Sequence, residues 1–240
     1  ILYLNKKIMK KTTVLLFLLI SSFQQISSQD ILNELNKSKD SILNLEIKGK
    51  QIIATIDAYD KSKSEIYSSI NKWVSVNYTS ANDVIQMNDK EAGIMIVKGL
   101  NSLNFLNPTR VIYPKTKAIP LKNKLLLNHL LEIKVKENKY RLIYTITGII
   151  ESAPLNSMHL NPNTLDCINL NKSTNESIAE FNNFWKEHFK NSLMGRKRRA
   201  KYLSLSKPTF NEINSRLALS FVSNFISIVE SVNETSDNDW

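Results

Sequence analysis

The stretch that decides the fold is W-V-S-V-N-Y-T-S-A-N-D-V-I-Q-M-N-D-K-E-A-G, residues 73–93. It continues a helical pattern that starts behind Ser62-Lys-Ser-Glu65, which has the spacing of a capping box. Residues 84–87, V-I-Q-M, then have the pattern of a strand. Residues 88–93 carry the Asn, Asp and Gly of a turn. The stretch therefore predicts a helix that leads into a β-hairpin, with the return strand at 94–98.

Further strands are predicted on both sides of this stretch. Residues 47–57 have the pattern of a strand or of a tight hairpin around Gly49. Residues 129–136 and 140–147 alternate apolar and polar side chains, which is typical of an antiparallel pair with one buried face. Residues 101–124 hold three prolines and little periodicity, so they predict a long loop or insertion. The fold class that follows is α+β, an antiparallel β-sheet with one helix packed on it.

The C-terminal part predicts a helical extension at 173–240, after a linker at 152–172 that is rich in Asn, Ser and Pro. A first amphipathic helix ends in the basic run 195–201, where cations suit the negative end of a helix dipole. Pro208 opens a last helix, whose second half is apolar almost all round and should be well buried. A strand pair in that second half is the alternative, which the unbroken length of the apolar segment disfavours.

A series of short motifs carries a family resemblance. In chain order they are Ser62-Lys-Ser-Glu-Ile-Tyr67, Trp73, Asp83-Val-Ile-Gln86, Asn88-Asp-Lys-Glu-Ala-Gly93, Lys98-Gly99 and the later pair Tyr140-Arg141. The series resembles the exported bacterial family called domain of unknown function 4468, known mainly from Bacteroidota, and covers about residues 46–151. The resemblance implies a fold like the TATA-binding protein (TBP) and implies no activity. Residues 101–124 depart from the family pattern as a longer insertion.

The N-terminus has the composition of a secretory signal peptide over residues 1–28. Four lysines precede a short apolar run, and small and polar residues follow it. The run is shorter than the roughly 20 residues of a membrane-spanning helix. We expect a start at Met9, cleavage after Ser28 and a lead-in at 29–45 that is either a short helix or irregular. The protein should be periplasmic or extracellular, and it should not be a lipoprotein because no cysteine follows the cleavage site.

Charge narrows the choice of partners. Removal of the four lysines of residues 1–28 lowers the net charge from +10 to +6. A charge of +6 is only weak evidence that a protein binds nucleic acid. We therefore expect no nucleic-acid partner. One dense basic cluster remains, and it could contact the phosphates of anionic lipid or lipopolysaccharide at a membrane surface. The alternative is a solvated helix end. The cluster consists of Arg196, Lys197, Arg198 and Arg199.

The acidic and aromatic residues of the opening stretch favour structural roles. Asp89 and Glu91 lie in a predicted turn, where Asp caps backbone groups and Glu meets solvent, rather than converging on a substrate. Asp83 should cap or lead into the strand. Trp73 and Tyr78 fall on the apolar helical face, so they are core residues rather than a stacking platform. We therefore expect no catalytic residues in this stretch.

No cofactor or metal ion is expected. His129, His159 and His188 lack the paired spacing of zinc ligands, and the single Cys167 has no base near it in the sequence. The chain has five glycines and no phosphate-binding loop. The function that follows is a non-enzymatic binding or structural module that meets a protein or envelope partner. The alternative is a small-molecule-binding protein or hydrolase with a pocket between the sheet and the C-terminal helices.

Overall fold

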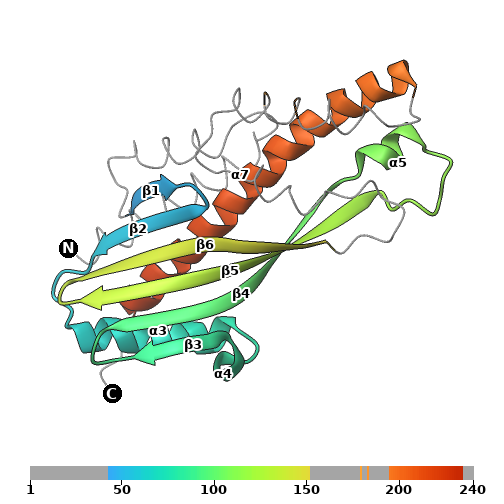
Figure 1. Cartoon of the computed structure of the whole chain (residues 1–240). Helices are drawn as coiled ribbons and strands as arrows, with labels where there is room; N and C mark the ends of the chain where they lie inside the picture. Colours follow the sequence, from blue (N-terminus) through green and yellow to red (C-terminus); the bar gives the residue numbers. More distant parts are fainter. Residues whose placement is uncertain (1–42, 152–178, 180–182, 184–194, 235–240) are drawn as a thin grey trace.

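The computed structural model describes residues 43–151, 179, 183 and 195–234 (Figure 1). Six antiparallel strands form one sheet in the order β1-β2-β6-β5-β4-β3. The elements are β1 Asn44–Lys48, β2 Gln51–Asp57, α3 Lys63–Asn77, α4 Ala81–Val84, β3 Ile85–Asp89, β4 Ile94–Leu106, α5 Pro108–Ile112, β5 Lys122–Lys136, β6 Lys139–Glu151 and α7 Arg196–Glu234. The predicted α+β class, an antiparallel sheet with a helix packed on it, is confirmed.

The first half of the sheet forms as its sequence predicts. β1 and β2 are a hairpin, and Gly49 takes the positive φ of 60° that the turn needs. α3 begins with the predicted capping box, in which the Ser62 amide donates to the Glu65 carboxylate at 2.7 Å and the Glu65 amide donates to the Ser62 hydroxyl. The core already includes Leu43 and Leu45, so the packed domain begins before the expected boundary at residue 46.

The join between α3 and β3 differs from the prediction by one short helix. Asp83 and Val84 lie in α4, because their amides both donate to the Ser80 carbonyl, at 3.2 and 3.3 Å. The strand therefore starts at Ile85 instead of Val84, and Asp83 does not lead directly into it. The predicted turn at the end of β3 is confirmed, with Gly93 at a φ of 72°.

The expectation of a loop over 101–124 is wrong for most of that segment. β4 does not end near Gly99 but continues to Leu106, and residues 101–106 pair with 122–127 of β5. The prolines stand just beyond the ladder, where none of them removes a ladder hydrogen bond: Pro108 opens α5, and Pro114 and Pro120 lie in the turn that follows. β6 likewise continues past Gly148, with a bulge opposite Asn128 and His129.

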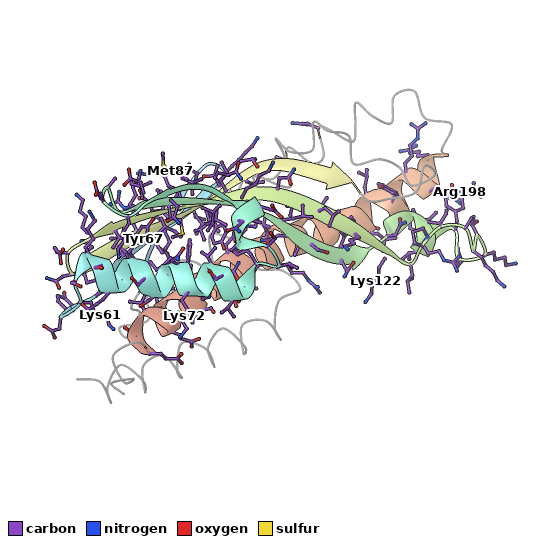
Figure 2. All side chains as sticks on the ribbon, turned by 90° about the horizontal axis from the view of Figure 1, so that it is seen from below. Lys61, Tyr67, Lys72, Met87, Lys122 and Arg198 are labelled. Atoms are coloured by element: carbon purple, nitrogen blue, oxygen red, sulfur yellow. The ribbon has the colours of Figure 1, made fainter. Side chains whose placement is uncertain are left out.

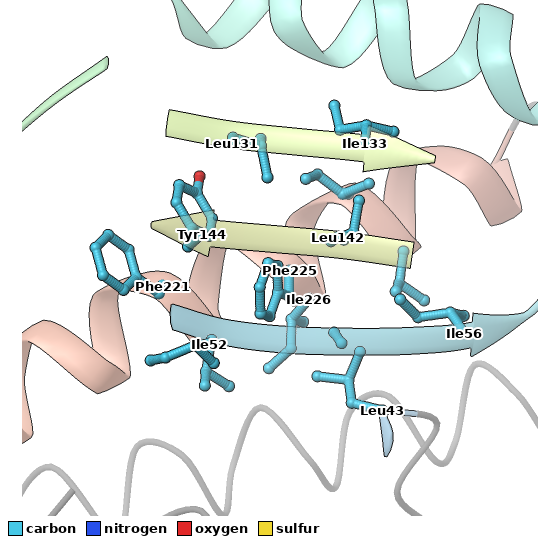
Figure 3. Packing of buried hydrophobic residues seen from close by; sticks show 14 of the residues in the cluster. Leu43, Ile52, Ile56, Leu131, Ile133, Leu142, Tyr144, Phe221, Phe225 and Ile226 are labelled. Atoms are coloured by element: carbon cyan, nitrogen blue, oxygen red, sulfur yellow. The ribbon is translucent and has the colours of Figure 1, made fainter. Parts of the chain in front are cut away.

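α3 and α7 cover the same face of the sheet and share one core with it (Figures 1 and 3). Alternate residues of β5 and β6 point into this core, as their pattern predicts. The Tyr144 ring stacks on Phe221 of α7 at 4.5 Å between centroids. Across the two helices, the Trp73 indole donates to the Ser227 hydroxyl at 2.9 Å. α7 is therefore part of the domain core and not a separate extension.

Two predictions about α7 are wrong. The helix does not open at Pro208 but runs unbroken from Arg196 to Glu234, so the basic cluster lies at its N-terminus and not at a helix C-terminus. Pro208 withholds one helical hydrogen bond. Packing of the preceding turns offsets that loss, because Tyr202 is buried and the Arg198 guanidinium lies 5.4 Å from the Tyr113 ring.

Several predicted segments fall outside the described residues. They are the signal peptide at 1–28, most of the lead-in at 29–45, nearly all of the linker and first helix between 152 and 194, and the tail from 235. Ala179 and Asn183 are described singly, and both are helical. Within the described residues no helix is both long enough and apolar enough to cross a membrane.

Candidate binding surface

The strongest chemical feature of the described chain is a basic end of the molecule, which we call the distal tip. It comprises residues 101–124, which finish β4, form α5 and start β5, together with residues 195–202 at the start of α7. These two segments carry ten cations and no acid. The cations are Arg110, Lys115, Lys117, Lys122, Lys124, Arg196, Lys197, Arg198, Arg199 and Lys201.

The turn between α5 and β5 is an ordered structure. The Asn107 amide donates to the Leu121 carbonyl at 3.0 Å, which closes the segment at its base. The Asn107 carbonyl accepts from the amides of Arg110 and Val111, which starts α5. The Arg110 guanidinium then donates to the carbonyls of Tyr113 and Pro114. Arg110 therefore holds the turn together, whereas the lysines that follow it are exposed.

One contact joins the two basic segments. Arg198 of α7 lies over the ring of Tyr113, in the cation–π geometry. Figure 2 shows Arg198 and Lys122 toward one end of the molecule, while Lys61 and Lys72 lie toward the other. Residues more than 70 positions apart in the sequence thus form a single surface.

The position of the Arg196–Arg199 cluster is electrostatically unfavourable for its helix. The N-terminal end of a helix carries a partial positive charge, so each cation in the first turn costs about 0.3–1 kcal/mol. The first turn of α7 contains no acid, and the preceding Gly195 has no side chain to cap it. At the predicted C-terminal position the cations would have stabilised the helix. At the observed N-terminal position they destabilise the helix, so helix stability does not explain why four cations occur there.

An apolar side chain is exposed beside these cations. Leu121 is 59% exposed and immediately precedes Lys122 at the start of β5. Tyr113, Ile112 and Ile119 on the same segment are half-buried. The tip therefore combines exposed charge with a small apolar surface.

The other candidate residues have structural roles where the structure describes them. Asp89 accepts a hydrogen bond from the Ala92 amide at 2.8 Å, which confirms that it caps the turn. The Lys63 ammonium donates to the backbone carbonyl of Glu91, and the Glu91 side chain is exposed, as predicted. Trp73 and Tyr78 pack edge to face at 6.1 Å against the core, as predicted.

His129 is buried in an apolar environment. Its ring lies 5.0 Å from that of Tyr144 and 5.8 Å from that of Phe221. Within the described residues neither ring nitrogen has a hydrogen-bond partner. Burial lowers the pKa of His129 to about 4, so the ring is neutral at pH 7. His159, His188 and Cys167 lie outside the described residues, and no group of three metal-ligating side chains occurs among the described ones.

The lysines of the α5–β5 turn and Leu121 were not recognised in the sequence as site residues. The signal that could have revealed them is the absence of Asp and Glu over residues 92–131, in a chain with 22 acids. Because residues 101–124 were expected to form a loop, this lack of acids gave no reason to predict a binding surface. Cations are common in exposed loops without any such role. Only the pairing of 101–106 with 122–127 brings them together at one end of the sheet.

An antiparallel sheet with its helices on one face, in this element order, defines the class as an α+β domain with a TBP-like fold. Residues 53–149 match the family model "Domain of unknown function (DUF4468) with TBP-like fold". The resemblance noted from the motifs is thus confirmed. The family description names no activity.

Two solved structures are similar to the chain. One is a TBP-like protein from Parabacteroides distasonis ATCC 8503, at 16% identity and a TM-score of 0.44, with 78% of this chain and 96% of that chain covered. The other is a DUF4468 family protein from Bacteroides ovatus ATCC 8483, at 14% identity and a TM-score of 0.34, with coverages of 48% and 66%. A search of curated proteins found no match.

Proposed function

We propose that the protein is an exported, non-enzymatic binding module of the bacterial periplasm or envelope. The observation that carries the proposal is the distal tip, an ordered surface with ten cations and no acid, assembled from two distant segments. The composition of residues 1–28, a basic start followed by a short apolar run, supports export. A surface of this kind binds by charge and needs no reacting group.

Two measurements test the proposal. Expression in a bacterial host, followed by fractionation and mass spectrometry, should find the chain outside the cytoplasm with Gln29 as its first residue. The purified chain, immobilised, should then retain a component of envelope extracts that elutes with salt. A chain that stays in the cytoplasm with residues 1–28 attached would contradict export, and retention of nothing above background would contradict the binding role.

The alternative function needs a cavity between the sheet and the C-terminal helices. Among the described residues this interface is filled by stacked side chains. Tyr144 packs on Phe221, and its ring lies 5.2 Å from that of Phe225 (Figure 3). The Tyr144 hydroxyl accepts a hydrogen bond from Asn224 at 3.0 Å. No observation at this interface favours a ligand, so we propose no second function.

A further inference from the structure

We infer that the distal tip docks end-on against an anionic lipid bilayer, with its cations at the lipid phosphates and Leu121 entering the interface. This inference rests on the proposed binding function and names the partner of its basic surface. It joins the Arg196–Arg199 cluster to a second basic segment, the turn before β5, which the sequence alone did not connect with it.

The first step of the argument is a group of exposed cations at one end of the molecule. On the strands away from the tip, two lysines pair with acids: Lys134 with Glu132 at 2.8 Å, and Lys139 with Asp57 at 3.3 Å. At the tip, by contrast, the two described segments contain no acid, and exposed cations gather there: Lys115, Lys117, Lys122, Arg196 and Lys197. Lysines and arginines clustered in this way are attracted to a surface of lipid phosphates.

The second step is the helix start. Cations in the first turn of α7 oppose the helix dipole, and local rules of this kind are most often broken where a residue serves a function. The first-turn amides, which Gly195 cannot cap, add backbone donors that suit a phosphate oxygen.

The third step distinguishes a bilayer from other polyanions. Leu121, exposed between Pro120 and Lys122, gives a nucleic acid nothing to pair with, but it can leave water at a lipid interface. Tyr113 has the amphipathic ring that is common at membrane interfaces. One face of that ring is covered by Arg198, which disfavours base stacking. The apolar component therefore favours lipid.

The fourth step is shape. α5 and the first turns of α7 lie at one end of the long sheet, whereas α3 and β3 lie at the other (Figure 1). A membrane that contacts the tip therefore meets both basic segments and leaves the body of the domain clear of the surface.

The test is co-sedimentation with vesicles of phosphatidylcholine and phosphatidylglycerol in equal parts, and with vesicles of phosphatidylcholine alone. The chain recovered after export should bind only the anionic vesicles, and added salt should release it. Each neutralised cation should weaken binding about fivefold, so Arg196→Ala, Lys197→Ala and Arg198→Ala together should weaken it about a hundredfold. Equal binding to both vesicle types, or equal binding of variant and wild type, would overturn the inference.

A matched control removes the same charge elsewhere. Lys72, Lys90 and Lys136 are exposed and lie away from the tip. Changing all three to Ala should alter vesicle binding less than about twofold, because charges beyond about 10 Å from the surface are screened. If this control loses as much binding as the tip variant, net charge and not the tip drives binding. Should the helix variant fold poorly by circular dichroism, Lys115→Ala, Lys117→Ala and Lys122→Ala test the same surface from the other segment.

Leu121→Ser separates lipid from a soluble polyanion. It should weaken vesicle binding about tenfold while leaving any binding to a DNA duplex unchanged. An unchanged vesicle affinity, or tighter binding of wild type to the duplex than to vesicles at the same salt, would overturn the lipid assignment. If the vesicle experiments fail and the chain still retains an envelope component, the proposed function stands and only the lipid partner falls.

Discussion

The two ends of the sheet use their side chains differently. At the end that holds the β5–β6 turn, acids and cations contact one another at the surface: Lys134 and Lys139 pair with acids, and the Lys63 amide donates to the Glu137 carboxylate at 3.0 Å. At the distal tip the described segments have cations and no acids. An exposed apolar side chain occurs at both ends, Leu121 at the tip and Tyr59 beside the β5–β6 turn, so charge is what distinguishes them. Exposed pairs of the first kind leave the surface charge balanced and add little to stability. The unbalanced charge of the second arrangement is suited to an external partner.

The same contrast holds for the two long helices. α3 begins with a serine cap, an acid in its first turn and the reciprocal hydrogen bonds of a capping box. α7 begins with four consecutive cations, directly after Gly195. Its stability must therefore come from packing further along, where the helix is buried against the sheet.

The largest expected effect tests whether α7 belongs to the core. Phe221→Ala removes a fully buried ring that stacks on Tyr144, and it should lower the free energy of unfolding by about 3–5 kcal/mol. Urea denaturation should show one transition that moves as a whole. The exposed neighbour Ser223, changed to Ala, should have an effect within about 0.5 kcal/mol. A second, separate transition affected by Phe221→Ala alone would show that α7 is an independent unit.

The end near the β5–β6 turn was predictable because its local and tertiary signals agree. The capping box at Ser62, the apolar face of α3 and the alternation in β5 and β6 each give the same answer as the packed structure. Even here the short α4 was missed, since Val84 suits a strand and only the two bonds to the Ser80 carbonyl reveal the helical turn.

The distal tip was not predictable, because its signals conflict. Three prolines suggested a loop, yet they stand just outside a ladder whose partners lie about 20 residues apart. Pro208 suggested a helix start, but burial of Tyr202 keeps the preceding turns helical. Both outcomes depend on long-range contacts, which a local pattern does not contain. The Arg196–Arg199 cluster was found in the sequence, but its helix end was assigned wrongly.

The second prediction concerns His129, which pairs with Gly99 of β4 near the middle of the sheet. Burial lowers its folded-state pKa to about 4 from an ordinary value of 6.5. Between these pH values the unfolded chain binds a proton that the folded protein does not. Stability should therefore be full above pH 6.5 and fall by about 1.4 kcal/mol per pH unit toward pH 4, about 3 kcal/mol in all.

His129→Leu provides the control, because leucine is of similar size and does not titrate. Urea denaturation at a series of pH values should show the slope between pH 6.5 and 4 in the wild type and a flatter profile in the variant. Parallel profiles for the two proteins would mean that another group causes the pH dependence.

The third prediction compares the two turns with positive φ. Gly93→Ala should cost about 2 kcal/mol more than Gly49→Ala. Both positions impose the left-handed backbone, but a Cβ at Gly93 would stand 2.4 Å from the Val135 carbonyl oxygen, whereas at Gly49 it would meet nothing within 4 Å. Thermal and urea denaturation of the two variants measure the difference. Equal losses would show that the β3–β4 turn shifts away from β5 without cost.

The smallest expected effect has the opposite sign and bears most directly on the tip. Arg196→Glu replaces a cation with an anion in the first turn of α7, where the dipole favours negative charge, so it should raise stability by about 0.5–1 kcal/mol. Lys201→Glu makes the same charge change in the second turn, where the dipole effect has largely fallen off, and should gain less. The same Arg196→Glu variant should bind anionic vesicles more weakly than wild type. A gain in stability together with a loss of vesicle binding would show that the cations of the tip serve binding, although they destabilise the start of α7. A loss of stability would show instead that Arg196 is needed for the fold.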